Sequence, residues 1–271
     1  MALTPQQCEF FHSFGYLVLP GLLADDVDWM AEEHQKVFEK NGVVHDGTKR
    51  TYVVPFIDQT EKLCALLDHP KVLEVLGSLL GDDFNYVGSD GSYYSGNTSW
   101  HDDGGHRPGG LTFAKFHIYL DTLTRDTGCI RAIPGSHLPG PWRDHLRENI
   151  WLQPFCESIG VAGTDIPCVA IENEPGDVAV LNHTTYHASF GGGTARRHFD
   201  LNLSSRAKTE EEMADLEKFI LPKERTKEKP SKYAPGEQDI MLGTATPERM
   251  RHLEQVIERE NLDRAAWEAT L

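Results

Sequence analysis

The sequence lacks several features that would point to particular classes of protein. Its 271 residues contain no apolar run near the roughly 20 residues that a helix needs to cross a bilayer. The opening stretch, MALTPQQCEF, has neither the basic nor the apolar segment of a secretory signal. Basic residues are few, since 26 Lys and Arg stand against 42 Asp and Glu, for a formal net charge of −16. We therefore expect a cytoplasmic protein without a nucleic-acid or membrane partner, because both partners demand a basic face.

Cysteine is also scarce, and its pattern excludes a disulfide framework. The five cysteines are odd in number, are scattered along the chain and form no C-x-x-C pair. This usage predicts free thiols in a reducing compartment. Internal repeats and low-complexity tracts are missing as well. The chain is nevertheless long enough, and at 39% hydrophobic residues apolar enough, to bury a substantial core.

Three stretches of different pattern are expected to form one domain over residues 1–271. Residues 1–83 contain helical patterns, beginning at Thr4-Pro5, which is typical of a helix N-terminus. Residues 84–206 hold short apolar or alternating runs between Gly, Pro and Asn, a spacing typical of a two-sheet sandwich or barrel. Residues 207–271 are charged and helical, and we expect this extension to cover the barrel or a partner subunit, as in a homodimer.

The stretch SWHDDGG at residues 99–105 is a candidate half of a metal site. Successive side chains on a strand alternate in direction, so His101 and Asp103 share one face while Asp102 points away. An imidazole and a carboxylate can then reach the same ion. Three-residue matches of this kind also occur by chance, so the pair alone is weak evidence.

The second candidate half follows the turn PGDV, where an apolar strand leads to His183 and His187. Either histidine would complete a set of two histidines and one carboxylate, the arrangement of non-haem Fe(II) oxygenases. A zinc pair on a helix is an alternative, but the strand-like approach disfavours it. Arg196 and Arg197 follow on the next predicted strand. A guanidinium grips a carboxylate at two points, which fits a 2-oxo acid co-substrate chelated to iron.

Four motifs in this order resemble the phytanoyl-CoA dioxygenase family over roughly residues 5–206. They are WHDD, DTGCIRAIPGSH (126–137), PGDVAVLN, and HAS followed by RR. The resemblance implies a mainly β fold with flanking helices, namely a double-stranded β-helix (jelly roll). It also implies an enzyme that uses Fe(II), 2-oxoglutarate and O2. Thr127 stands where the family usually has Asn.

The resemblance also implies roles for individual residues. The iron ligands would be His101, Asp103 and a distal histidine, for which the spacing from the GD turn favours His187 over His183. The carboxylate of Asp103 implies oxygenation, since the related halogenases lack it. For the arginine that holds 2-oxoglutarate, the family position by count is His198, so the loop before it is shortened and both Arg196 and Arg197 stay open. Arg196 is favoured because it shares a face with polar residues.

Further residues are weaker candidates. His117 matches a family position that contacts 2-oxoglutarate, and Thr98 is a candidate for the same role. Contacts to substrate, or to the residues around the iron, are predicted for Tyr93, Lys115, Tyr119, Arg107 and Asp200.

The expected reaction is oxidation, most simply hydroxylation, of an aliphatic C–H in a small metabolite or a natural-product intermediate, with release of succinate and CO2. Two alternatives remain at this point. One is a jelly-roll enzyme that uses zinc or manganese for hydrolysis or isomerisation, and the other is a non-catalytic metal-binding relative.

Overall fold

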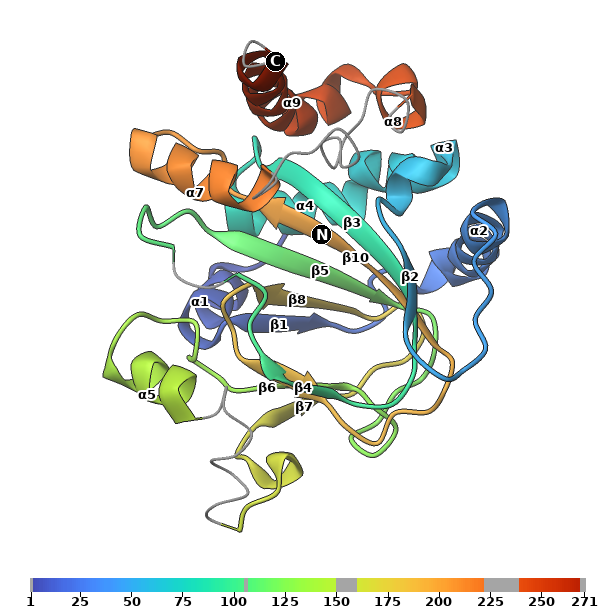
Figure 1. Cartoon of the computed structure of the whole chain (residues 1–271), viewed down its shortest axis with the longest axis vertical. Coiled ribbons are helices and arrows are strands. Elements are labelled where there is room, and N and C mark those ends of the chain that lie inside the picture. The colour runs from blue at the N-terminus through green and yellow to red at the C-terminus, as the bar shows by residue number, and fades with distance from the viewer. Residues whose placement is uncertain (1, 105–106, 150–159, 222–238, 269–271) are drawn as a thin grey trace.

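Two facing antiparallel sheets form the centre of the protein (Figure 1). The structure, a computed structural model, describes residues 2–104, 107–149, 160–221 and 239–268. The larger sheet has the order β1-β8-β5-β10-β3-β2 and the smaller has the order β4-β9-β6-β7. Neighbours in both sheets come from distant parts of the sequence, as the predicted barrel requires.

The strands of the larger sheet are β1 (Tyr16–Leu19), β2 (Thr51–Val53), β3 (Asn85–Tyr94), β5 (Phe113–Tyr119), β8 (Val178–Asn182) and β10 (Arg196–Ser204). Those of the smaller sheet are β4 (Thr98–His101), β6 (Ile130–Ala132), β7 (Val169–Ile171) and β9 (His187–Ser189). The helices are α1 (Pro5–Phe14), α2 (Val27–Lys40), α3 (Glu61–Cys64), α4 (Pro70–Leu80), α5 (Pro141–Asn149), α7 (Glu210–Ile220), α8 (Asp239–Gly243) and α9 (Pro247–Glu268).

The N-terminal helix begins and ends as its sequence predicts. The Thr4 hydroxyl accepts a hydrogen bond from the backbone N–H of Gln7, and the Gln7 side chain accepts one from the backbone N–H of Thr4. This capping box satisfies two N–H groups that would otherwise lack partners. Gly15 ends the helix at φ +80°, a conformation that glycine adopts without a steric penalty.

Apolar packing lies on the outer face of the larger sheet. Phe116, Ile118, Phe199 and Leu201 are fully buried there, in one cluster with apolar residues of α1, α2 and α4. The C-terminal extension also packs on the barrel, as expected. Residues of α7 join Phe113 in a second cluster, and α9 contacts β3. In Figure 1, α7, α8 and α9 lie on the side of the larger sheet that is remote from the smaller one.

Strand β3 is longer than its sequence indicates. The short runs FNYVG and GSYYSG, which the glycines of the sequence set apart, together form the single strand Asn85–Tyr94. Gly91 lies against the ring of Phe56, and a Cβ atom there would overlap that ring. This glycine therefore serves close packing within the strand rather than a break between two strands.

Within the described residues, no helix combines the length and the apolar character that crossing a bilayer requires.

Candidate metal centre

Three side chains from the smaller sheet converge as one candidate metal site. His101 ends β4 and pairs with His187 at the start of β9, so the two imidazoles lie side by side with ring centres 4.2 Å apart. Asp103 follows in the turn after β4. Its Oδ1 lies 3.7 Å from Nε2 of His101 and its Oδ2 lies 3.8 Å from Nε2 of His187. The ligand atoms all lie within 4.8 Å of one another, close enough to hold one ion.

Backbone carbonyls orient both imidazoles. Nδ1 of His101 lies 2.7 Å from the carbonyl of Ser99, and Nδ1 of His187 lies 3.0 Å from that of Thr185. Each Nδ1 therefore carries the proton and donates it, which leaves both Nε2 lone pairs directed at Asp103. Burial lowers the pKa of His187 to about 4, so this imidazole is neutral near pH 7 and available as a ligand.

The charge at the site is balanced by Lys115. Burial would raise the pKa of the Asp103 carboxyl, but Lys115 and the neighbouring histidines hold it well below its ordinary value. Nζ of Lys115 lies 3.1 Å from Oδ2 of Asp103 and 3.7 Å from Oδ2 of Asp200. Burial opposes the charge of Lys115, yet these carboxylates raise its pKa above the ordinary value. Asp103 is thus an ionised carboxylate, the form that binds Fe(II). The donor set, two imidazoles and one carboxylate, fits a non-haem iron centre.

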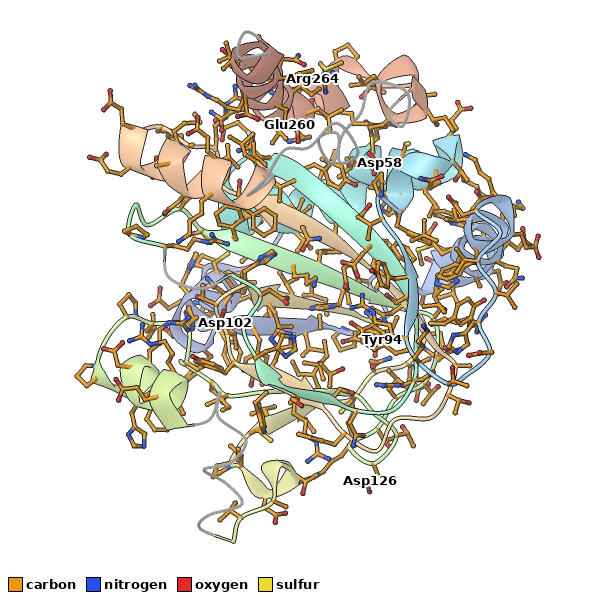
Figure 2. The ribbon with its side chains drawn as sticks, viewed as in Figure 1. Asp58, Tyr94, Asp102, Asp126, Glu260 and Arg264 are labelled. Atoms are coloured by element: carbon orange, nitrogen blue, oxygen red, sulfur yellow. The ribbon has the colours of Figure 1, made fainter. Side chains whose placement is uncertain are left out.

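The residues between and after these ligands point elsewhere. Asp102 accepts a hydrogen bond of 2.7 Å from Arg143, in α5, and Figure 2 shows Asp102 on the side of that helix. The predicted alternation of the two acids is therefore observed. His183, for which a surface or supporting position was expected, is fully buried. Its backbone carbonyl accepts the N–H of Asp103 at 2.8 Å, so it supports the turn that carries the ligand.

The two adjacent arginines have different surroundings. Arg196 is only 8% exposed and lines the main cavity. Its Nη1 donates to Ser189 Oγ at 2.7 Å and to the carbonyl of Gly128 at 2.6 Å. None of the described residues supplies it with a carboxylate. Arg197 instead pairs with Asp121 at 2.7 Å, outside that cavity.

The main cavity, of about 620 Å³, lies between the two sheets. The inward faces of β5 and β10 contribute the charged and polar residues Lys115, His117, Tyr119, His198 and Asp200. Thr98 and the three candidate iron ligands also line it. Among the described residues, the Tyr119 hydroxyl and Nε2 of His117 are buried without a hydrogen-bond partner.

A second group of possible ligands lies in the same cavity. His117, His198 and Asp200 also bring their ligand atoms within 4.8 Å of one another. Asp200 already faces Lys115, and it is paired with His117. In the first group, by contrast, a backbone carbonyl holds Nδ1 of each histidine, which leaves Nε2 of both rings for a metal ion. The first group is therefore the better candidate for the iron site.

The structure corrects two sequence predictions. Tyr93 points away from the cavity, where its hydroxyl donates to Gln35 at 2.8 Å. Its neighbour Tyr94 lines the cavity instead, and Figure 2 shows it between the sheets. Arg107 does not line the main cavity. It lies over the ring of Phe113 at 4.3 Å and borders a second hollow near α5. The sequence HRPGG (106–110), a candidate for a loop over the iron, falls partly outside the described residues.

Several cavity residues escaped the sequence analysis. Arg50, Tyr52 and Ser189 are among those that line the cavity. Ser189 lies two residues after His187 on β9, so strand alternation directs it to the same side. The sequence pattern could therefore have identified it. Arg50 belongs to the irregular segment before β2, where no periodicity indicates direction.

Comparison with known proteins gives a family match. A family model described as phytanoyl-CoA dioxygenase (PhyH) matches residues 11–199. No curated protein sequence matches the chain.

Solved structures with the same fold include three enzymes. One is SnoK, described as a non-heme alpha-ketoglutarate-dependent carbocyclase from nogalamycin biosynthesis, with 21% identity over 75% of this chain and 84% of that chain, and a TM-score of 0.59. Another is EctD from S. alaskensis, solved with 2-oxoglutarate and 5-hydroxyectoine, with 20% identity over 75% and 76% of the two chains and a TM-score of 0.57. HygX from Streptomyces hygroscopicus, solved with nickel and 2-oxoglutarate, has 16% identity over 78% and 90%, with a TM-score of 0.58. These similarities confirm the jelly-roll fold.

Proposed function

The chain belongs to the phytanoyl-CoA dioxygenase family of 2-oxoglutarate-dependent non-haem iron enzymes, and from this premise we propose that it hydroxylates an aliphatic C–H of a small polar molecule, a metabolite or a natural-product intermediate. Fe(II) is the cofactor, and 2-oxoglutarate and O2 are the co-substrates. When bound, the iron couples oxidative decarboxylation of 2-oxoglutarate, which yields succinate and CO2, to oxidation of the substrate.

The observation that carries this proposal is the buried guanidinium of Arg196, which lacks a counter-ion among the described residues. A buried charge is costly unless it is paired. The distal carboxylate of 2-oxoglutarate would supply the missing partner, and the Ser189 hydroxyl, which accepts from Arg196 at 2.7 Å and donates to the carbonyl of Gly128, would orient the guanidinium toward it. Tyr119 offers a buried hydroxyl without a partner in the same cavity. We assign these residues, rather than Arg197, to 2-oxoglutarate.

The roles of the remaining residues follow from their positions. His101, Asp103 and His187 would hold the iron, and Lys115 would fix the second oxygen of Asp103. Thr98 and His117 line the same cavity as the metal centre and Arg196, and they would contact 2-oxoglutarate. Asp200 accepts from His117 and orients that ring. The protein itself contributes binding, orientation and a site shielded from water.

The cavity lining limits the substrate. Charged and polar side chains dominate it, and the aliphatic ones among them are few: Val54, Leu123, Ile130 and Ala188. A long acyl chain would leave these polar groups without hydrogen bonds, at a cost for each group. A compact polar molecule would satisfy them. The zinc or manganese alternative gains no support from any observation here.

The test is turnover with Fe(II) and 2-oxoglutarate in air. We expect succinate and CO2 to form in a reaction that requires O2, and a substrate identified by faster succinate formation to gain one oxygen atom. If no succinate forms, the proposed enzyme class is wrong. If the product has lost two hydrogens and gained no oxygen, the enzyme desaturates or cyclises, and hydroxylation is contradicted.

A further inference from the structure

A second anchored arginine lies in the same cavity. Arg50 lines the cavity together with Tyr94, and its side chain is 38% exposed. Its Nε donates to Ser92 Oγ at 3.0 Å, and its Nη2 donates to the same oxygen at 2.8 Å and to Asp90 Oδ1 at 2.6 Å. The guanidinium also lies 4.2 Å over the ring of Tyr94. An arginine fixed in this way has lost its rotamer freedom before any ligand binds.

Arg50 and Asp90 each keep polar atoms free for a ligand. Nη1 of Arg50 carries two N–H groups, and neither has a hydrogen-bond partner in the described part of the chain. Oδ2 of Asp90 lies 4.0 Å from Nζ of Lys115, which is beyond hydrogen-bond distance. Both residues line the cavity. A charged donor and a charged acceptor are therefore offered side by side.

The charges of the cavity favour a ligand with no net charge. With iron and 2-oxoglutarate bound, the distal carboxylate would neutralise Arg196, and the iron would neutralise Asp103 and the chelating carboxylate. Lys115 is then matched by Asp200, and Arg50 by Asp90. A net anion would add a negative charge beside the matched carboxylates of Asp90 and Asp200, and a net cation would add a positive charge beside Lys115 and Arg50. A molecule that carries both charges avoids both penalties.

We propose that the substrate is a zwitterion, such as a free amino acid, whose carboxylate binds Arg50 and whose ammonium group binds Asp90. This assignment rests on the proposed function. Lys115 links the two parts of the site, since its ammonium group faces both Asp90 and the iron ligand Asp103. Asp90 and the metal centre therefore lie close to the same ammonium group, that of Lys115. Carbon atoms close to the ammonium group of the substrate are the ones brought toward the iron.

The test uses the full chain loaded with Ni(II) and 2-oxoglutarate, which does not turn over, and measures thermal stabilisation by added compounds. The probes are α-, β- and γ-amino acids, each with its N-acetyl derivative and its primary amide. We expect at least one free amino acid to raise Tm, and blocking either end to weaken its binding about ten- to hundredfold, because each block removes a charge-assisted hydrogen bond.

Two variants assign each end of the ligand. In Arg50→Gln, binding of the stabilising amino acid should weaken at least about tenfold, and its preference over the amide should disappear. In Asp90→Asn, the preference over the N-acetyl derivative should disappear. Arg206→Gln is the matched control, because Arg206 pairs with Glu254 at 2.8 Å, outside the cavity lining. It should leave amino-acid binding unchanged.

The outcomes separate this inference from the function on which it rests. If 2-oxoglutarate fails to stabilise the Ni(II)-loaded protein, the proposed function itself is wrong. If 2-oxoglutarate binds, but singly blocked or uncharged compounds stabilise as well as free amino acids, or no zwitterion in the panel binds, the zwitterion assignment is overturned. Unchanged amino-acid binding in Arg50→Gln would overturn it as well.

Discussion

Strands β5 and β10 present two contrasting faces. On the outer face Phe116, Ile118 and Phe199 are fully buried among other apolar side chains. On the inner face the alternate residues include Lys115, His117 and Asp200, which line the cavity. The two faces share one backbone and differ only in the direction of successive side chains. Burial of apolar surface on the outer face stabilises the fold, and the inner face carries the chemistry.

The inner face is stabilised poorly by its own contacts. Buried polar groups without partners among the described residues include the Tyr119 hydroxyl, Nε2 of His117 and Nε of Arg196. Each such group opposes folding unless a ligand binds to it. Substitutions on the two faces should therefore separate stability from activity, and the following predictions test that separation.

The largest effect is expected for Asp103→Ala. Removal of an iron ligand should lower turnover about a thousandfold or more, a larger loss than the ten- to hundredfold typical of residues outside the ligand shell. The thermal unfolding midpoint should stay near that of the native protein, because the side chain is part of the cavity and not of the apolar core. Succinate formation and Tm are the measurements.

Asp102→Asn is the matched control, since its neighbour Asp103 faces the cavity and Asp102 faces Arg143. It should retain most of the turnover. Substantial turnover in Asp103→Ala would remove Asp103 from the ligand set.

The next largest effect is a loss of stability, which we expect for Phe199→Ala on the outer face of the larger sheet. Loss of this fully buried ring should lower the free energy of unfolding by about 3–5 kcal/mol. The activity per folded molecule should stay close to that of the native protein at temperatures well below unfolding. Denaturant titration and succinate formation check this. A large loss of kcat with unchanged stability would contradict the separation of the two faces.

Arg196→Gln and Arg197→Gln form a pair with a smaller expected effect. Loss of the buried guanidinium should weaken 2-oxoglutarate binding to the Ni(II)-loaded protein about ten- to hundredfold. Loss of Arg197, which is paired with Asp121, should change it by less than about threefold. Calorimetric titration measures both. The opposite ranking would assign 2-oxoglutarate to Arg197.

The smallest effect is a pH dependence that comes from the outer side of the larger sheet. Burial lowers the pKa of His34 from 6.5 to about 3, so the folded state holds it neutral. Its contribution to stability is therefore complete above pH 6.5 and is lost as the pH falls toward 3. In this window the free energy of unfolding should fall with a slope that approaches about 1.4 kcal/mol per pH unit.

His34→Gln removes the titrating group and keeps a donor for the carbonyl of Ser92, which His34 contacts at 3.3 Å. The slope of the free energy of unfolding against pH, between pH 6 and 4, should become shallower by up to about 1.4 kcal/mol per pH unit, which is the contribution of one proton. Denaturant unfolding over this range measures it. An unchanged slope would show that His34 does not control acid stability.

Strand alternation predicted the parts of the site that lie within single strands. It separated Asp103 from Asp102, and it favoured Arg196 over Arg197 for the cavity face, in line with their observed positions. These positions depend on local backbone direction, which the sequence pattern reveals. The family resemblance added the jelly-roll fold and the choice of His187.

Alternation failed where the chain bends. Between Tyr93 and the metal strand lies the turn at 95–97, across which alternation cannot be counted. Arg107 lies in a glycine-rich stretch of the sequence, where no periodicity indicates the direction of a side chain. Arg50 reaches the site from an irregular segment 51 residues before His101 in the printed sequence. Such positions depend on tertiary packing, which a short sequence pattern does not reveal.

We infer that the two-histidine, one-carboxylate centre binds Fe(II) and that this centre and Arg196 together bind 2-oxoglutarate. The most direct measurement is the visible absorption of the protein with Fe(II) and 2-oxoglutarate in the absence of O2. We expect the weak charge-transfer band of a 2-oxo acid chelated to Fe(II), at lower 2-oxoglutarate concentration in the native protein than in Arg196→Gln. Absence of this band at saturating Fe(II) and 2-oxoglutarate would contradict the claim.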